Sequence, residues 1–112
     1  MEALIATILE RILDDGVLDA ADLARVTHTS RRAVARWCAG ERSPARDTEE
    51  RLLETTAVVD FLRTHLRRDA ARLWIRSPNS DLGYAKPIDL IAGGEYMRVI
   101  GVVLSMAEGV PV

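Results

Sequence analysis

The sequence has few of the residues that build cross-links, metal centres and membrane spans. Cys38 is the one cysteine among 112 residues, so an intramolecular disulfide is impossible and a cysteine-based metal site is not expected. No apolar run approaches the roughly 18 residues of a membrane-spanning helix. Residues 1–13 carry charges at helical intervals instead of a basic leader before an apolar block. We therefore expect a cytoplasmic protein with no membrane association, no metal and no cofactor.

Aromatic residues are also scarce, at 4% of the chain, so the core must consist of Leu, Val, Ile and Ala. The 48% hydrophobic and 29% charged residues are ordinary for a globular domain. Enzyme motifs are absent as well: there is no HExxH, phosphate loop or CxxC sequence. Cys38 follows Trp37 on the apolar side of an expected helix, where a packing thiol is the ordinary interpretation. The sequence predicts a protein that is not an enzyme.

The charges that are present are segregated along the chain. Residues 1–24 contain six acidic residues and one arginine, a net charge of −5, whereas residues 25–46 contain six arginines and one glutamate, a net charge of +5. The whole chain has a net charge of only −2. A basic segment inside an acidic chain is typical of a local anion-binding face, although ordinary surface arginines on a solvated helix are the alternative interpretation.

Three helices are expected in this first part, over residues 1–13, 20–26 and 31–39. Asp19 with Asp22 resembles a capping box for the second helix, and Ser30 is an N-cap for the third, which Gly40 ends. Two short helices joined by a turn of about four residues are typical of a helix-turn-helix.

The residues at the turn fit this motif. Ala24 is small where the two helices approach, and His28 lies where a residue that tolerates positive φ is needed. Val34 and Trp37 are expected on the buried face of the helix over residues 31–39, which is the second helix of the motif. Its other face carries arginines, whose guanidinium groups pair with guanine edges and phosphates. The predicted DNA-binding residues are Thr29, Ser30, Arg31, Arg32, Arg36, Arg42 and Arg46.

The second part of the chain is also expected to be helical. Asp47 with Glu50 predicts a capping box that opens a helix over residues 48–66, apolar on more than one face and therefore packed on both halves or at a dimer interface. Further helices are expected over residues 67–75, 87–92 and 95–108, with a polar loop at 79–86 and an apolar tail after Gly109. The last helix is expected to bury Tyr96, Val99, Ile100, Val103, Leu104 and Ala107.

The chain resembles the Xre/MbcA/ParS group of type II antitoxins over nearly its full length, and most of all the MbcA type. The first half is similar to the Xre-like helix-turn-helix over residues 30–40. The second half is similar to the toxin-binding domain in three motifs. These are Leu73-Trp74 with Ser77-Pro78-Asn79, the run Lys86-Pro87-Ile88-Asp89-Leu90-Ile91, and Gly94-Glu95-Tyr96 with Arg98-Val99 and Glu108-Gly109.

The resemblance implies an all-α fold with a helix-turn-helix domain at residues 1–46 packed on a toxin-binding domain at residues 47–112. It also implies a partner, a RES-domain toxin that degrades NAD and whose active-site cleft the antitoxin covers. Self-association, as a homodimer within a larger complex, and binding of operator DNA are expected. The toxin-binding residues implied are Trp74, Ser77, Pro78, Asn79, Lys86, Pro87, Glu95, Tyr96, Arg98, Glu108, Val110, Pro111 and Val112.

An alternative of another class stays open at this point. The chain would then be a plain helix-turn-helix transcriptional regulator whose C-terminal helices only dimerise it. The two hypotheses differ in whether they predict that the neighbouring gene encodes a toxin.

Overall fold

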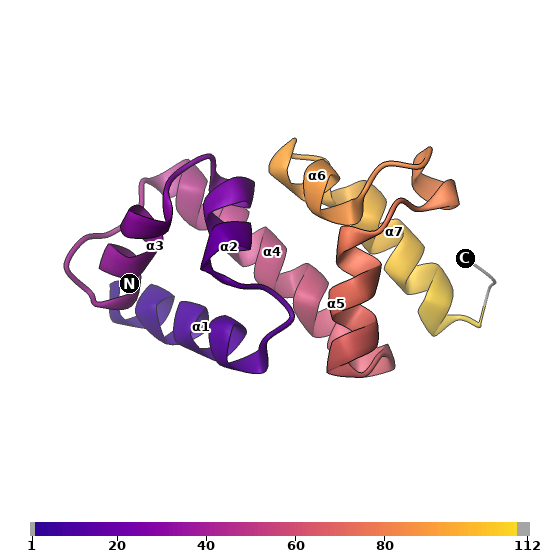
Figure 1. Cartoon of the computed structure of the whole chain (residues 1–112), viewed down its shortest axis with the longest axis horizontal. Coiled ribbons are helices and arrows are strands. Elements are labelled where there is room, and N and C mark those ends of the chain that lie inside the picture. Colours follow the sequence, from indigo (N-terminus) through magenta and orange to yellow (C-terminus); the bar gives the residue numbers. More distant parts are fainter. Residues whose placement is uncertain (1, 110–112) are drawn as a thin grey trace.

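Residues 2–109 are described by a computed structural model, in which helices joined by short loops are the regular secondary structure (Figure 1). The first three are α1 (Glu2–Asp15), α2 (Ala20–Thr27) and α3 (Arg31–Cys38), followed by the long α4 (Arg46–His65). The second half adds α5 (Arg68–Arg76), a short 3-10 helix η1 (Ser80–Leu82), α6 (Pro87–Ala92) and α7 (Tyr96–Ala107). Within the described residues the only β-type pairing is a single bridge between Asn79 and Ala85. The predicted all-α class is confirmed.

The local signals in the sequence explain several helix ends. Asp19 caps α2 through a reciprocal pair of hydrogen bonds with Asp22, each 2.9 Å long. Ser30 caps α3 by accepting a hydrogen bond from the N–H of Ala33 at 3.1 Å. His28 has φ 56° and ψ 40°, the left-handed conformation expected at this turn. These caps confirm the predicted ends of α2 and the start of α3.

The predicted capping box at Asp47 is wrong. α4 begins at Arg46 with Ala45 as its N-cap, and no side chain caps it. Asp47 and Glu49 therefore lie in the first turn, where negative charges stabilise the helix dipole without acting as the cap. The side chain of Asp47 accepts a hydrogen bond only from the adjacent N–H of Thr48, at 3.2 Å.

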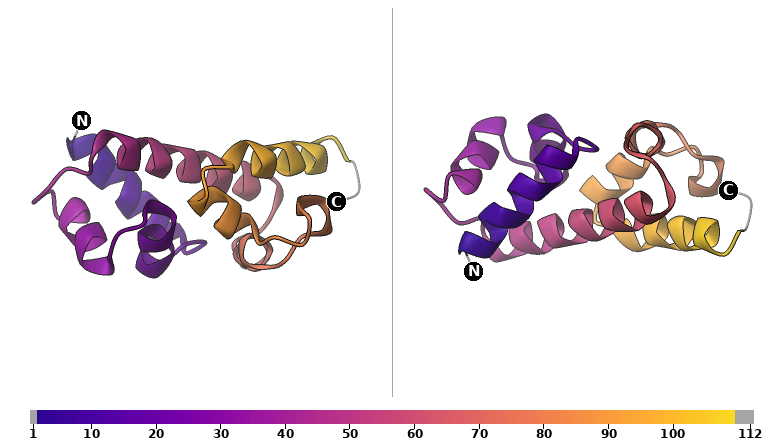
Figure 2. Two further views of the ribbon diagram at one scale, coloured as in Figure 1. Left: turned by 90° about the horizontal axis from the view of Figure 1, so that it is seen from above. Right: turned by 90° about the horizontal axis from the view of Figure 1, so that it is seen from below.

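The long helix α4 is shared by both halves of the molecule. In the two views of Figure 2, α4 and α7 form one long side, with α2 and α3 near one end and the α5–α6 segment near the other. The buried apolar side chains make one continuous cluster that runs from Ile5 to Val103. The predicted packing of α4 on both halves is confirmed, and the boundary after residue 46 remains a prediction.

The last helix buries fewer side chains than expected. Val99, Ile100 and Val103 are buried as predicted, and Tyr96 is half-buried. Leu104 and Ala107 are exposed, which corrects the expectation. Leu104 follows Met97 by seven residues and therefore shares its exposed stripe on α7.

Among the described residues, no helix is both long enough and apolar enough to cross a lipid bilayer. The same residues contain no cluster of three or more His, Cys, Asp or Glu side chains that could hold a metal ion.

Candidate nucleic-acid and protein interfaces

The helix α3 is held by one face and presents the other to solvent. Val34 and Trp37 are buried against the neighbouring helices, with 1% and 6% of their surfaces exposed. Arg31, Arg32 and Arg36 lie on the opposite side and are exposed. The sequence therefore separates a packing face from an arginine face on the same eight-residue helix, at the end of the molecule remote from α7 (Figure 1).

A groove brings most of the predicted DNA-binding residues together. It lies between α3 and the start of α4, and Pro44 and Thr48 form part of its wall. Arg31 and Arg46 are not part of its lining, although both are exposed. The predicted residues that line it are Thr29, Ser30, Arg32, Arg36 and Arg42.

Most of these arginines are not neutralised within the chain. Among the described residues, Arg31, Arg32 and Arg42 form no ion pair and no side-chain hydrogen bond. Arg36 approaches Glu41, and Arg46 approaches Glu50, only to 3.9 Å. Exposed ion pairs at such distances contribute little to the stability of the fold. The groove thus offers free guanidinium groups that can bind phosphate oxygens or base edges.

Arg25 differs from the other arginines of the basic segment. It lies on α2 and pairs with Asp89 of α6. Its charge therefore serves the contact between the two halves, and it does not belong to the exposed basic surface.

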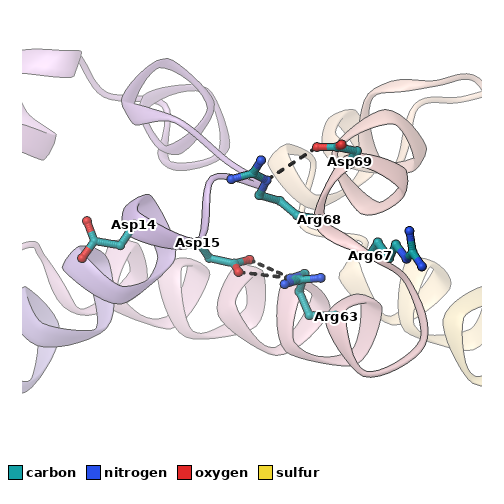
Figure 3. A pocket seen from close by; sticks show the side chains of 6 residues that line it. All are labelled: Asp14, Asp15, Arg63, Arg67, Arg68 and Asp69. Atoms are coloured by element: carbon teal, nitrogen blue, oxygen red, sulfur yellow. Dashed lines mark hydrogen bonds and ion pairs between the residues drawn. The ribbon is translucent and has the colours of Figure 1, made fainter.

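The acidic N-terminal segment has a structural role that charge counting did not reveal. Figure 3 shows Arg63 of α4 pointing to Asp15 at the end of α1, and its Nε donates to both carboxylate oxygens at 3.1 and 3.2 Å. Arg72 donates to the carbonyl of Gly16 at 3.0 Å. Asp14 and Arg67, which also line this charged hollow, point away from the pair. The hollow lies at the contact between the two halves, which we call the seam. The charges at its centre, Arg63 and Asp15, are already paired with each other.

A second part of this seam is less exposed. Arg76 of α5 pairs with Asp22 of α2 and donates to the carbonyl of Val17 at 2.8 Å. Burial raises the pKa of Asp22 above its ordinary value, against the lowering effect of the Asp19 N–H and of Arg76. The N–H of Asp22 donates to Asp19 and lowers the pKa of that carboxyl. The two neighbouring carboxyls therefore have pKa values shifted in opposite directions.

Two predicted toxin-binding residues have a clear structural function. Ser77 Oγ donates to the carbonyl of Leu73 at 2.6 Å and finishes α5. Asn79 closes the following loop, because its side chain accepts from the N–H of Asp81 at 2.8 Å and its carbonyl accepts from the N–H of Tyr84 at 2.8 Å. The Asn79 N–H also donates to the carbonyl of Ala85 at 3.1 Å. The loop after α5 is thus built on Asn79.

The other predicted toxin-binding residues differ in accessibility. Pro87 is buried at the start of α6, so it shapes the surface and offers little contact area. Trp74 and Tyr96 are half-buried against the core. Val110, Pro111 and Val112 lie outside the described residues. The exposed members are Pro78, Lys86, Glu95, Arg98 and Glu108.

Three large exposed apolar side chains in this half are absent from the toxin-binding residues that the resemblance implied, although Leu73 belongs to one of its motifs. Leu73, Tyr84 and Met97 are 70%, 75% and 64% exposed. Tyr84 also has a φ of 66°, unusual for a residue with a bulky side chain. The signals available in advance were the place of Leu73 in a motif of the resemblance and a tyrosine within the mainly polar loop 79–86. Tyr and Met side chains are enriched in protein interfaces relative to the rest of the surface, so these exposed residues are candidates for contact with a partner.

Cys38 lies outside both surfaces. Its thiol is half-buried in a shallow hollow between α1 and α3 that Leu13, Ala20 and Val34 also line. Burial raises the pKa of the thiol, and the charge of Glu10 adds to the effect. A raised pKa keeps the sulfur protonated and makes it a poor nucleophile.

The fold and its exposed surfaces define a small all-helical binding protein. No protein-family model matches the chain. It is 44% identical over 89 residues to mycobacterial cidal antitoxin MbcA of Mycobacterium tuberculosis and to the same protein of Mycobacterium bovis, covering 80% of this chain and 79% of each relative. It also matches a chain in the crystal structure of the M. tuberculosis MbcT–MbcA toxin–antitoxin complex, with a TM-score of 0.85, 40% identity and 96% of both chains covered. The chain belongs to the MbcA family of antitoxins.

Proposed function

We propose that this protein neutralises a cognate toxin by binding it through the C-terminal half and covering its active site. The observation that carries the proposal is the match to a chain of the MbcT–MbcA complex over 96% of both chains, which includes α5, α6 and α7. Covering a cleft needs no catalytic group on the antitoxin, so the lack of enzyme motifs in the sequence fits this mechanism.

The partner proposed is a RES-domain toxin that degrades NAD, as the family resemblance implies. The contact surface would comprise residues 74–87 and 94–112. Within it, the exposed Tyr84 and Met97 supply apolar area, to which the adjacent exposed Leu73 adds, and Lys86 and Arg98 supply charge. Interfaces of this kind combine an apolar centre with a polar rim.

A second activity proposed for the chain is binding of operator DNA, with α2 and α3 as a helix-turn-helix. Support comes from the unpaired Arg31, Arg32 and Arg42 beside the groove at the N-terminus of α3. Backbone N–H groups at a helix N-terminus add to the attraction for phosphate. The groove is a better candidate than the seam at Arg63, whose charge is already paired with Asp15.

Self-association is proposed through apolar side chains that the fold leaves exposed. Leu53 and Phe61 lie on one stripe of α4 and are 41% and 40% exposed. Residues eight apart on a helix share a face, and the half-buried Ala57 lies between them. Burying this stripe against a second copy would remove the apolar area from water.

The test is co-expression with the product of the adjacent gene, affinity purification, and an NAD assay on each protein alone and on both together. We expect a stable complex in which NAD consumption by the partner disappears. Absence of a complex and of any rescue would contradict the toxin-neutralising role and favour the plain transcriptional regulator.

A matched variant separates the two activities. Arg31→Ala combined with Arg36→Ala should weaken DNA binding at low salt and leave neutralisation intact, because neither residue lies in the C-terminal half. Each lost phosphate contact should lower the slope of log affinity against log salt by about 1. Equal DNA affinity of the variant and the original chain across the salt series would contradict the assignment of α3.

A further inference from the structure

The loop between η1 and α6 contains a tight turn with two consecutive left-handed residues. Gly83 has φ 64° and Tyr84 has φ 66°. The N–H of Ala85 donates to the carbonyl of Leu82 at 3.1 Å, which closes the four residues into a β-turn. Positive φ at both central positions is the geometry of a type I′ turn, which glycine and asparagine favour. The carbonyl of Asn79 holds the turn by accepting from the N–H of Tyr84 at 2.8 Å.

The tyrosine in this turn strains the backbone and gives the fold nothing in return. A left-handed residue with a side chain brings its Cβ close to the following carbonyl oxygen, and a bulky residue is a clear outlier there. The ring of Tyr84 is 75% exposed and does not pack on the core, whereas Leu82 beside the turn is 2% exposed. The Tyr84 hydroxyl has no hydrogen-bond partner among residues 2–109. Strain of this kind collects at functional sites.

The helices on either side of the turn are fixed to the rest of the molecule. Arg76 of α5 pairs with Asp22 of α2. The last carbonyl of α6, that of Ala92, accepts a hydrogen bond from Nη1 of Arg51 of α4 at 2.7 Å. In Figure 1 the segment between α5 and α6 extends away from α4, at the end of the molecule remote from α3. The turn therefore presents the ring of Tyr84 at a defined place before any partner binds.

We propose that Tyr84 is a specificity-determining residue for the toxin. Its ring enters a hollow on the toxin that has apolar walls and a polar group at its inner end, which pairs with the hydroxyl. This inference rests on the proposed function, since the turn lies within the proposed contact surface at residues 74–87. A tyrosine suits this role because it buries a large rigid ring at a low cost in entropy and still carries a polar tip.

The rigidity of the turn makes the ring selective. A ring held in place before binding loses little freedom in the complex, so a toxin with a matching hollow gains affinity. A toxin without such a hollow meets a projecting ring on a backbone that cannot retract, because the bonds to Asn79 and Leu82 hold it. Specificity of this kind combines a favourable contact with one partner and a clash with another.

Two variants separate the ring, the hydroxyl and the turn. Tyr84→Asn removes the ring and places in the turn a residue that tolerates positive φ, so the melting temperature should not fall. Tyr84→Phe keeps the ring and the strain and removes only the hydroxyl. Leu4→Ser is the matched control, because it removes an exposed apolar side chain on α1, outside the proposed surface.

The experiment measures the affinity of each chain for two purified toxins, the cognate one and the toxin of the M. tuberculosis MbcT–MbcA complex. For the cognate toxin, Tyr84→Asn should lower the affinity at least about thirtyfold, mainly through faster dissociation. Tyr84→Phe should lower it about fivefold, as expected for one lost hydrogen bond. The ratio of the two toxin affinities should fall at least about tenfold in Tyr84→Asn, since the ring sets the discrimination. Leu4→Ser should change neither affinity.

The outcomes distinguish the inference from the function on which it rests. An original chain that does not bind the cognate toxin overturns the proposed function and the inference with it. An original chain that binds, together with a Tyr84→Asn chain of similar affinity or an unchanged ratio between the toxins, overturns the inference alone. So does a Tyr84→Asn chain whose only change is weaker self-association in light scattering, because the ring would then face a second copy.

Discussion

Arg76 of α5 pairs with Asp22 of α2, 54 residues earlier in the sequence, and both side chains are largely shielded from solvent. The same guanidinium also donates to the carbonyl of Val17. This pair joins α2 in the antitoxin's first half to α5 in its second half. The N-terminal carboxylates and the arginines of α4 and α5 are therefore parts of one structural seam.

Arg76→Met should lower the free energy of unfolding by about 2 to 3 kcal/mol at neutral pH, because it leaves the Asp22 carboxylate shielded and unpaired. Urea unfolding followed by circular dichroism measures the change. The double variant Asp22→Asn with Arg76→Met should recover part of the loss. A single variant as stable as the original chain would show that the pair contributes nothing.

The cost of Arg76→Met should also depend on pH. Burial already raises the pKa of Asp22, and removing Arg76 takes away an influence that lowers it. A carboxyl whose pKa is raised on folding contributes stability below its unfolded pKa and loses it as the pH rises through the folded pKa. The difference between variant and original should therefore shrink between neutral pH and about pH 4. A constant difference would contradict this account of Asp22.

Tyr84→Gly should stabilise the fold by about 1 kcal/mol and weaken toxin binding. The gain comes from removing a side chain from a residue with φ 66°, and the loss comes from removing an exposed ring. Tyr84→Ala is the matched control, since it removes the ring but keeps the backbone strain. Thermal unfolding and toxin titration are the measurements. Equal toxin affinity of all three chains would place Tyr84 outside the interface.

Cys38 should react slowly with iodoacetamide. Because burial raises the pKa of its thiol, the reactive thiolate is rarer in the folded chain than in the unfolded chain at the same pH. Alkylation rates from pH 7 to 10, with and without urea, measure this effect. The midpoint of the folded profile should lie above that of the unfolded profile. Coincident profiles would show that the thiol is not shielded.

Leu53→Ser combined with Phe61→Ser should weaken self-association about tenfold, because both side chains contribute to the exposed apolar stripe on α4. Light scattering during size-exclusion chromatography over a concentration series is the measurement. Leu4→Ser, at another exposed leucine on α1, is the control and should have no effect. An unchanged dimer in the double variant would exclude this stripe as the interface.

The parts of the fold predicted from the sequence depend on neighbours within four residues. The cap at Ser30, the left-handed His28 and the two faces of α3 follow from local hydrogen bonds and helical spacing. The start of α4 was predicted wrongly because the real N-cap, Ala45, has no capping side chain, whereas Asp47 with Glu50, two residues later, has the residue types of a capping box.

The seams could not be read in advance because they depend on tertiary packing. Arg51 and Ala92 are 41 residues apart, and Arg76 and Val17 are 59 apart. Nothing in an arginine's sequence neighbours shows whether it will meet a carbonyl or remain in solvent. For the same reason Arg25 was counted with the basic surface, although Asp89 neutralises it.

The shared helix α4 also limits how this protein can be recombined. Its side chains complete the core against α2 at one end and against α7 at the other, so neither half has a full core without it. In a hybrid joined at residue 46, α4 would come from the parent that supplies the second half. The first half, from the other parent, would then have to pack on the surface of an α4 that is not its own. Exchanging toxin specificity between relatives should therefore succeed when loops and exposed side chains of α5–α7 are grafted, and fail when whole halves are exchanged.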